Sequence, residues 1–276
     1  MTFKALQMAQ VRRAEAERDR AAWRSVLAAG LRTLAAALVS AAVSLGAWQA
    51  WRWATASSAF IIREIRFSGL VHAQEADLLN RGGLKLGANL FRTDLTRAAR
   101  AVEGHPWIAS ATLTRRLPGE VLVTVVEYRA AALVQLGGLY VLSDEGRLFK
   151  RAAPEDRLDL PVVTGLSREA WAEQKPELQL RLFGALHLLD TWQASGFPVA
   201  SVSEVRLDDD GGFTLFAHDG TAVQEVRLGS SDISLKLRRL AQIRAALARR
   251  GERAARIDLD NPARPDQAAA TLADKR

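Results

Sequence analysis

The 276-residue chain contains no cysteine, and it lacks the sequence motifs that usually mark a catalytic or metal-binding site. Without cysteine it folds without disulfides, which is compatible with an exported domain and equally with a cytosolic one. Phosphate-binding glycine loops are also missing, and Ser195-Gly196 lacks the G-x-S-x-G frame of a nucleophile elbow. The four histidines are scattered with no metal-ligand spacing; they are His72, His105, His187 and His218. We therefore expect no catalytic residue, no metal, no cofactor and no small-molecule substrate.

One acidic run admits two interpretations. Asp208-Asp209-Asp210-Gly211 faintly resembles a calcium-binding loop, but its glycine comes too early and no glutamate occupies the twelfth position. A hairpin turn between two strands is the favoured interpretation.

Acidic residues are absent between Asp19 and Glu64, and this gap contains the uncharged run Thr33 to Trp51. At about 1.5 Å rise per residue the run spans roughly 28 Å, close to the thickness of a bilayer core. Trp48, Trp51 and Trp53 crowd its far end, as aromatic belts do at a membrane surface. We predict a transmembrane helix over 33–53. A cleaved signal peptide and a buried soluble helix are the alternatives, but the run and its preceding tail are long for the former.

Residues 1–32 carry seven basic and three acidic side chains, so they account for +4 of the net charge of +7. This bias predicts a cytoplasmic tail over 1–32 and an exported domain beyond the helix. Because most of the excess charge lies in the tail, it indicates topology and not nucleic-acid binding. The small polar residues 54–59 are expected to form a linker.

Residues 60–128 alternate between strand and helix patterns. Strands are expected at 61–67, 107–114 and 121–127, and short helices at 74–80 and from an N-cap at Thr93 to Gly104. This β-α-α-β-β order is that of a POTRA domain, the polypeptide-transport-associated module of envelope proteins. Trp107 is interpreted as a packing residue, and Glu127 is assigned no chemistry. Arg115-Arg116 is interpreted as a solvated strand end, with a basic patch that faces lipid or a partner as the less favoured alternative.

A second region is expected over 129–261. Its strands are predicted at 133–136, 139–142, 148–149, 202–207, 213–217, 223–228 and 256–260, and its helices at 176–195 and 233–250. The predicted fold class is thus α+β, with one transmembrane helix, a POTRA domain, and a C-terminal, mostly antiparallel β domain with two flanking helices. Residues 262–276 are expected to form a final strand and tail.

Several segments carry a family resemblance in order and in register. Residues 105–127 (HPWIASATLTRRLPGEVLVTVVE) resemble the P-W-V-x-x-A-x-V-x-R-x-x-P-x-x-L-x-V-x-V-x-E signature of the FtsQ/DivIB cell-division proteins. Residues 89–95 are similar to the family's N-x-F…D-L stretch, and residues 141–149 to its V-D-x-x-G-x-x-F element. The L-P-x-x-x-G and L-G…K-L-x-R-L patterns have counterparts at 160–165 and 227–240.

The resemblance implies a bitopic scaffold of the bacterial divisome that links early and late division proteins. It would bind FtsB- and FtsL-like bitopic partners when a partner strand is added to the edge of its sheet. Its POTRA domain and membrane helix would help to recruit it. It would lie in the inner membrane at the septum as a single-pass type II protein with a periplasmic C-terminal domain.

The expected partner-binding residues form two short segments near the C-terminus. They are Arg256, Ile257, Asp258, Leu259 and Asp260 in the penultimate strand, and Gln267, Ala268, Ala269, Ala270 and Thr271 in the last strand. Here the chain departs from the family, whose V-D-L-R-aromatic sequence becomes Ile257 to Asn261, followed by Pro262 and Pro265. The alanine-rich last segment offers little side chain for specificity.

Two other functions compete with this hypothesis. POTRA modules also occur in envelope transport and secretion proteins, although these usually carry several POTRA units and a large barrel. A membrane-anchored enzyme would require catalytic groups that come together only in three dimensions.

Overall fold

The computed structural model describes residues 3–273 except 174, 221, 262, 265 and 266; for residues 3–22, 24–29 and 175 it describes the backbone alone. The described chain divides into two compact units. One comprises residues up to Arg66 with Leu84–Leu95 and Thr114–Leu122, and the other comprises Phe67–Gly83, Thr96–Leu113 and Val123 onward.

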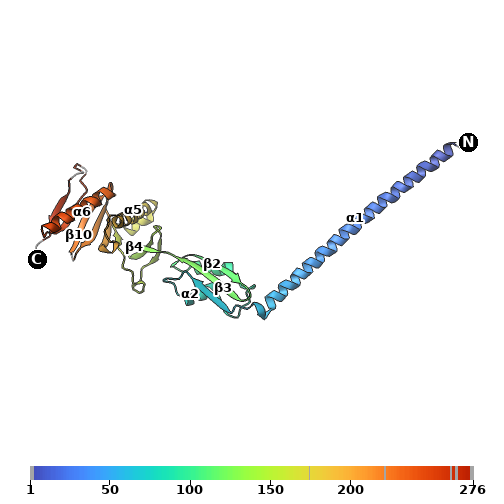
Figure 1. The fold of residues 1–276 in the computed structure, drawn as a ribbon, viewed down its shortest axis with the longest axis horizontal. Helices are drawn as coiled ribbons and strands as arrows, with labels where there is room; N and C mark the ends of the chain where they lie inside the picture. Colours follow the sequence, from blue (N-terminus) through green and yellow to red (C-terminus); the bar gives the residue numbers. More distant parts are fainter. Residues whose placement is uncertain (1–2, 174, 221, 262, 265–266, 274–276) are drawn as a thin grey trace. The chain divides into compact units, whose positions relative to one another are not determined.

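The N-terminal part is one long helix, α1 (Phe3–Ala56) (Figure 1). Its stretch Gly30–Ala56 is the one segment of the described chain that is long and apolar enough to cross a bilayer. No side chain in its apolar window is buried, so the structure does not favour a buried soluble helix. This helix supports a single-pass membrane protein.

The expected linker at 54–59 differs from the structure. Ala54 to Ala56 form the last turn of α1, and a 3-10 helix, η1 (Ser58–Phe60), follows at once. The Ser57 hydroxyl accepts a hydrogen bond from the Ala59 amide at 3.1 Å, which caps the short helix.

The next five elements have the predicted β-α-α-β-β order. They are β1 (Glu64–Ser68), α2 (Glu75–Gly82), α3 (Leu95–Glu103), β2 (Ile108–Arg116) and β3 (Glu120–Glu127). The strands form a sheet in the order β1-β3-β2. The middle strand β3 contains the strand predicted at 121–127, and its side chains alternate between the two faces, because Val121, Val123 and Val125 are buried.

One expectation about a single residue in this region was wrong. Helix α3 begins at Leu95, and the hydroxyl of Thr93 donates to the Asn89 carbonyl instead of capping that helix. Arg115 and Arg116 are exposed at the end of β2, as expected, and the Arg115 guanidinium also donates to the carbonyls of Leu90 at 2.9 Å and Thr93 at 2.7 Å. Trp107 is 5% exposed and stacks on His72, as expected of a packing residue.

The C-terminal region is built on a nine-stranded sheet in the order β12-β11-β10-β9-β8-β7-β4-β5-β6. Five of its strand pairings are antiparallel, and β7–β4, β7–β8 and β10–β11 are parallel. The strands are β4 (Ala130–Gln135), β5 (Leu139–Ser143), β6 (Leu148–Arg151), β7 (Val162–Thr164), β8 (Val202–Leu207), β9 (Phe213–Asp219), β10 (Ala222–Gly229), β11 (Ala254–Asp258) and β12 (Ala269–Leu272).

Sequence patterns missed β7, whose three residues join the two halves of this sheet. Its neighbours β4 and β8 are about 70 residues apart in the chain, so no local pattern reports this pairing.

The helices α5 (Lys175–Ala194) and α6 (Ile233–Arg249) pack on one face of the sheet (Figure 1). Leu182 and Leu189 of α5 and Leu237 and Leu240 of α6 join the strand residues of a single core that also holds the fully buried Trp192. Shorter helices are η2 (Pro154–Asp156), α4 (Arg168–Glu173) and η3 (Val199–Ser201). Among the described residues, no helix covers the opposite face of strands β8 to β12.

Candidate partner-binding edge

The last two strands of the sheet are held by a hydrophobic anchor. In β11, Ile257 is fully buried, as is Leu259 just beyond the strand, and both join the core under α5 and α6. The Leu259 amide donates to the Arg227 carbonyl at 2.9 Å, which extends the parallel pairing with β10. The side chains of Ile257 and Leu259 are therefore part of the core and cannot contact a partner. Among the predicted residues of this segment, only Arg256, Asp258 and Asp260 could do so.

Strand β12 forms the edge of the sheet. It pairs antiparallel with β11, with Asp258 opposite Ala269, Ile257 opposite Ala270 and Arg256 opposite Thr271. All four residues of β12 are exposed, and within the described chain no strand lies on its other side. Such an edge presents unpaired N–H and C=O groups to any incoming extended peptide.

The direction of these backbone groups follows from one hydrogen bond and from the register of β12 on β11. The Ala273 amide donates to the Arg253 carbonyl at 2.8 Å, so Ala273 faces β11. Because backbone groups alternate along an antiparallel strand, Ala269 and Thr271 also face β11, whereas Ala270 and Leu272 point to the open edge.

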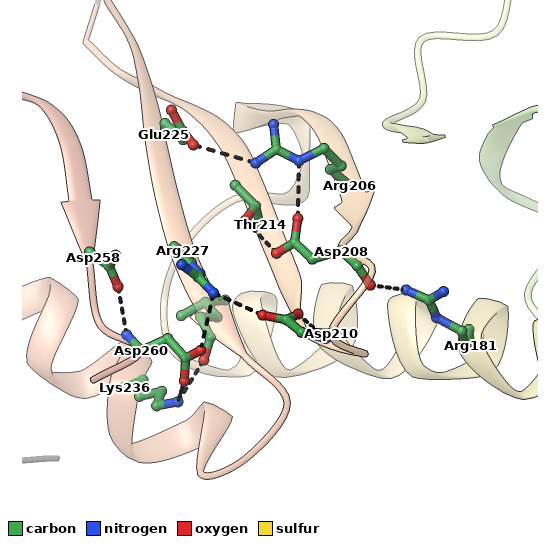
Figure 2. A network of polar contacts seen from close by, with 12 residues as sticks. Arg181, Arg206, Asp208, Asp210, Thr214, Glu225, Arg227, Lys236, Asp258 and Asp260 are labelled. Carbon is green, nitrogen blue, oxygen red and sulfur yellow. Dashed lines mark hydrogen bonds and ion pairs between the residues drawn. The ribbon is translucent and has the colours of Figure 1, made fainter. Parts of the chain in front are cut away.

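The family-like segments at 227–229 and 236–240 converge on Asp260. The buried Lys236 ammonium donates to the Leu228 carbonyl at 2.6 Å and to Asp260 Oδ1 at 3.0 Å (Figure 2). Gly229 has φ +64°, and a Cβ there would lie 2.1 Å from Asp260 Oδ1. Through the contact with Lys236, Asp260 holds the chain in place just after the end of β11.

A ladder of charged residues covers the open face of the sheet beside this edge. Arg206 donates to Asp208 at 3.0 Å and to Glu225 at 3.5 Å, and Arg227 donates to Asp210 at 2.8 Å (Figure 2). Arg256 extends the ladder to the edge, because its Nε lies 3.9 Å from Glu225 and its side chain is 48% exposed.

The ion pairs of the ladder shift its pKa values. The hydrogen bond to Asp208 is the main cause that raises the pKa of Arg206. The Gly212 amide and, more weakly, the Arg227 guanidinium hold the pKa of Asp210 below its ordinary value. Arg206 and Asp210 are therefore charged at neutral pH.

The acidic run Asp208 to Gly211 is a hairpin turn between β8 and β9, as favoured. The Asp208 amide donates to the Gly212 carbonyl, and the Gly211 amide donates to the Asp208 carbonyl, each at 3.0 Å. The Asp208 carboxylate accepts hydrogen bonds from Arg206 and Thr214, and the Asp210 carboxylate accepts one from Arg227. Among the described residues, no group of three or more His, Cys, Asp or Glu side chains could hold a metal ion.

Sequence patterns did not identify Arg206, Glu225 or Arg227 as part of this surface. Their alternation with buried valines within β8 and β10 carried a signal that they share a face. Which strands lie side by side came only from the tertiary structure. Of the other predicted site residues, Gln267 and Ala268 are exposed before β12. Pro262 and Pro265, at which the chain departs from the family pattern, lie outside the described residues.

Comparisons with known proteins agree with this architecture. The family model "POTRA domain, FtsQ-type" matches residues 60–128, and "Cell division protein FtsQ/DivIB, C-terminal" matches residues 132–260. The cell division protein FtsQ of Anaeromyxobacter sp. (strain K) is 44% identical over 268 residues, which cover 97% of this chain and 89% of that protein.

Two further relatives named cell division protein FtsQ show the same relationship. The protein of Myxococcus fulvus is 41% identical over 77% of this chain and 74% of its own length. That of Geobacter sp. (strain M21) is 30% identical over 91% of both chains. This chain belongs to the FtsQ/DivIB family of cell-division proteins.

Proposed function

We propose that this chain is a membrane-tethered, non-catalytic scaffold of the divisome that links early and late division proteins and binds FtsB- and FtsL-like bitopic partners by strand addition at β12. The observation that carries the proposal is the exposed edge of β12, whose Ala270 and Leu272 point unpaired backbone groups outward. A partner segment in extended conformation would satisfy these groups as a tenth strand of the sheet.

The side chains next to the edge would supply the specificity that the alanines lack. Arg256 and Thr271 lie opposite each other on the open face, and Arg256 is half exposed. A partner strand would lie beyond β12, two strand spacings or roughly 10 Å from β11. At that distance the exposed Arg256 guanidinium would attract an acidic residue placed beside Thr271, and Asp258 would disfavour one placed beside Ala269.

A four-residue edge offers only a few backbone hydrogen bonds, each with a net contribution of about 1 kcal/mol. The partner contact is therefore weak in solution and depends on tethering. If both proteins are anchored in one membrane, their effective concentration rises and the weak contact becomes populated.

The proposed topology is that of a single-pass type II protein of the inner membrane at the division septum. The N-terminal tail is cytoplasmic because its basic residues outnumber the acidic ones seven to three. The C-terminal domain is periplasmic. The POTRA domain and the membrane helix provide additional contacts with other divisome proteins. This role needs no catalytic residue, cofactor or metal.

Removal of residues 267–276 tests the proposal. A longer deletion from Arg256 would also remove Ile257 and Leu259, and it would open the hydrophobic core. The shorter deletion removes the edge strand alone, so we expect the protein to stay folded in the membrane and lose co-purification of FtsB- and FtsL-like proteins. Unchanged co-purification would refute strand addition at β12.

A further inference from the structure

The end of the membrane helix is fastened by a side chain from a distant loop. The Asn89 amide nitrogen donates to the carbonyls of Ala54 at 3.0 Å and Ser57 at 3.4 Å, while its oxygen accepts the amides of Phe91 at 3.0 Å and Arg92 at 3.2 Å. Ala54 lies in the last turn of α1, where backbone carbonyls have no partner within the helix. Asn89 therefore satisfies the helix end and holds its own loop against it.

Aromatic contacts place the same loop at the level of the membrane surface. Phe91 lies 6.3 Å from the Trp51 ring and 5.1 Å from the Phe60 ring, and Phe60 lies 5.6 Å from Trp53. Tryptophans at the end of a membrane span sit among the lipid headgroups. Because Phe91 reaches Trp51, two positions further into the helix than Trp53, its loop would lie at headgroup depth when α1 spans the membrane as proposed.

Backbone hydrogen bonds bring two more segments to this point. The Ile62 amide donates to the Ala88 carbonyl, and the Arg63 amide donates to the Gly119 carbonyl, each at 2.8 Å. The loop 84–93 and the β2–β3 turn thus flank the chain where it leaves the span.

These two segments expose large apolar side chains. Leu86 is 66% exposed and Leu117 is 63% exposed. Cations lie directly beside them in the sequence, Lys85 before Leu86 and Arg116 before Leu117.

The charge of this surface is positive. Segments 57–66, 84–95 and 114–122 carry six basic and three acidic residues, a net charge of +3. Two of the acids, Glu64 and Glu120, pair with Arg66. Of the five other cations in these segments, Arg115 donates to backbone carbonyls. The other four, Arg63, Lys85, Arg92 and Arg116, are exposed and have no described ion pair.

We propose that this surface, the membrane foot (Leu86 and Leu117 with Arg63, Lys85, Arg92 and Arg116), docks on the anionic headgroups of the leaflet next to the end of α1. Apolar side chains flanked by cations are typical of interfacial binding, in which the former enter the headgroup region and the latter attract anionic lipid. Continuity with the membrane anchor, through Asn89 and Phe91, favours lipid over a protein partner as the occupant.

The absence of cysteine makes the test direct. Single-cysteine variants Leu86→Cys and Leu117→Cys of the full chain are labelled with a polarity-sensitive fluorophore and reconstituted into vesicles. One set of vesicles is pure phosphatidylcholine, and the other also contains phosphatidylglycerol. Leu180→Cys, at a position in α5 that is 70% exposed, serves as the control site.

We expect blue-shifted emission and protection from aqueous quencher at 86 and 117, but not at 180, in the anionic vesicles. Each cation near an anionic surface strengthens attachment about fivefold, so Arg63→Gln, Lys85→Gln, Arg92→Gln and Arg116→Gln together should weaken docking by roughly 10²- to 10³-fold. The matched control neutralises four exposed arginines elsewhere, Arg157, Arg238, Arg249 and Arg250, and should leave docking unchanged.

Labels at 86 and 117 that remain as exposed to water as the label at 180 in both lipids would overturn the proposal. Equal protection in neutral and anionic vesicles would overturn its charge selectivity. Loss of docking in the matched control would likewise show that total charge, and not this surface, is responsible.

Discussion

His72 and Glu127 are joined twice: Glu127 Oε2 accepts the His72 backbone amide at 2.8 Å and lies 3.2 Å from Nδ1 of the His72 ring. The other carboxylate oxygen accepts the amides of Val71 at 3.0 Å and Ala73 at 2.9 Å. The carboxylate is 4% exposed. One buried side chain at the end of β3 thus organises the turn that leads into α2.

Glu127→Gln should destabilise the protein by about 1–3 kcal/mol, because an amide cannot accept three backbone hydrogen bonds and its NH₂ group would face donors. Thermal unfolding of the full chain in detergent, followed by near-UV circular dichroism, measures the effect. Glu64→Gln is the matched control: Glu64 pairs only with exposed Arg66, so its loss should leave the melting temperature nearly unchanged. Equal melting temperatures of wild type and Glu127→Gln would contradict this role.

The same carboxylate predicts a pH dependence. Burial opposes ionisation of Glu127, but hydrogen bonds from the amides of residues 71–73 outweigh it and hold the pKa below the ordinary value of 4.5. A lowered folded-state pKa stabilises the fold above the unfolded-state pKa, and the contribution disappears as pH falls through the folded-state value. The stability difference between wild type and Glu127→Gln should therefore be constant at neutral pH and shrink below pH 4.5.

Gly229→Ala should cost more than about 2 kcal/mol of stability and displace Asp260. The residue has φ +64°, which alone costs a non-glycine residue about 1 kcal/mol, and its new Cβ would collide with the Asp260 carboxylate. Gly211→Ala is the control, since Gly211 has φ +83° but no atom lies within 4 Å of the place that its Cβ would take. Urea unfolding measures the free energy of unfolding of both variants, and the difference between their losses gives the cost of the collision. Similar losses of stability in the two variants would argue against the collision.

Ala270→Pro should abolish partner co-purification while the sheet stays intact. The Ala270 amide points to the open edge, so proline removes a donor that only a partner would use. Thr271→Pro is the contrasting variant, because it removes an amide that faces β11 and should lower stability as well. Ala270→Val keeps the amide and should retain binding. Retained binding by Ala270→Pro would count against strand addition at this edge.

A fluorescent protein fused to the N-terminus and expressed at native level should form a band at the division site. This position follows from membership of the FtsQ/DivIB family and from the single membrane helix. A uniform envelope outline would instead favour the transport hypothesis, and diffuse cytoplasmic signal would contradict the membrane anchor.

Local patterns were sufficient for most secondary structure. The uncharged run at 33–51, the alternation in β3 and β8, and the apolar stripes of α5 and α6 are patterns within single segments. Each can be recognised without knowing what the segment packs against. The motif at 105–127 and its companions also indicated the family, which the comparisons confirmed. The domain boundary after residue 128 and the binding residues at 256–260 and 267–271 stay predictions.

The sequence by itself therefore determined the long apolar helix, the family and most of the order of elements, because these depend on residues close together in the chain. Only the tertiary structure decided that β7 joins β4 to β8. It also decided that Glu127 and Arg115 form hydrogen bonds with the backbone of distant loops, and that Lys236 pairs with Asp260. Each of these is a hydrogen bond or ion pair between distant segments. Its formation depends on which strands and loops the hydrophobic core brings together, and periodicity along the chain carries no record of that choice.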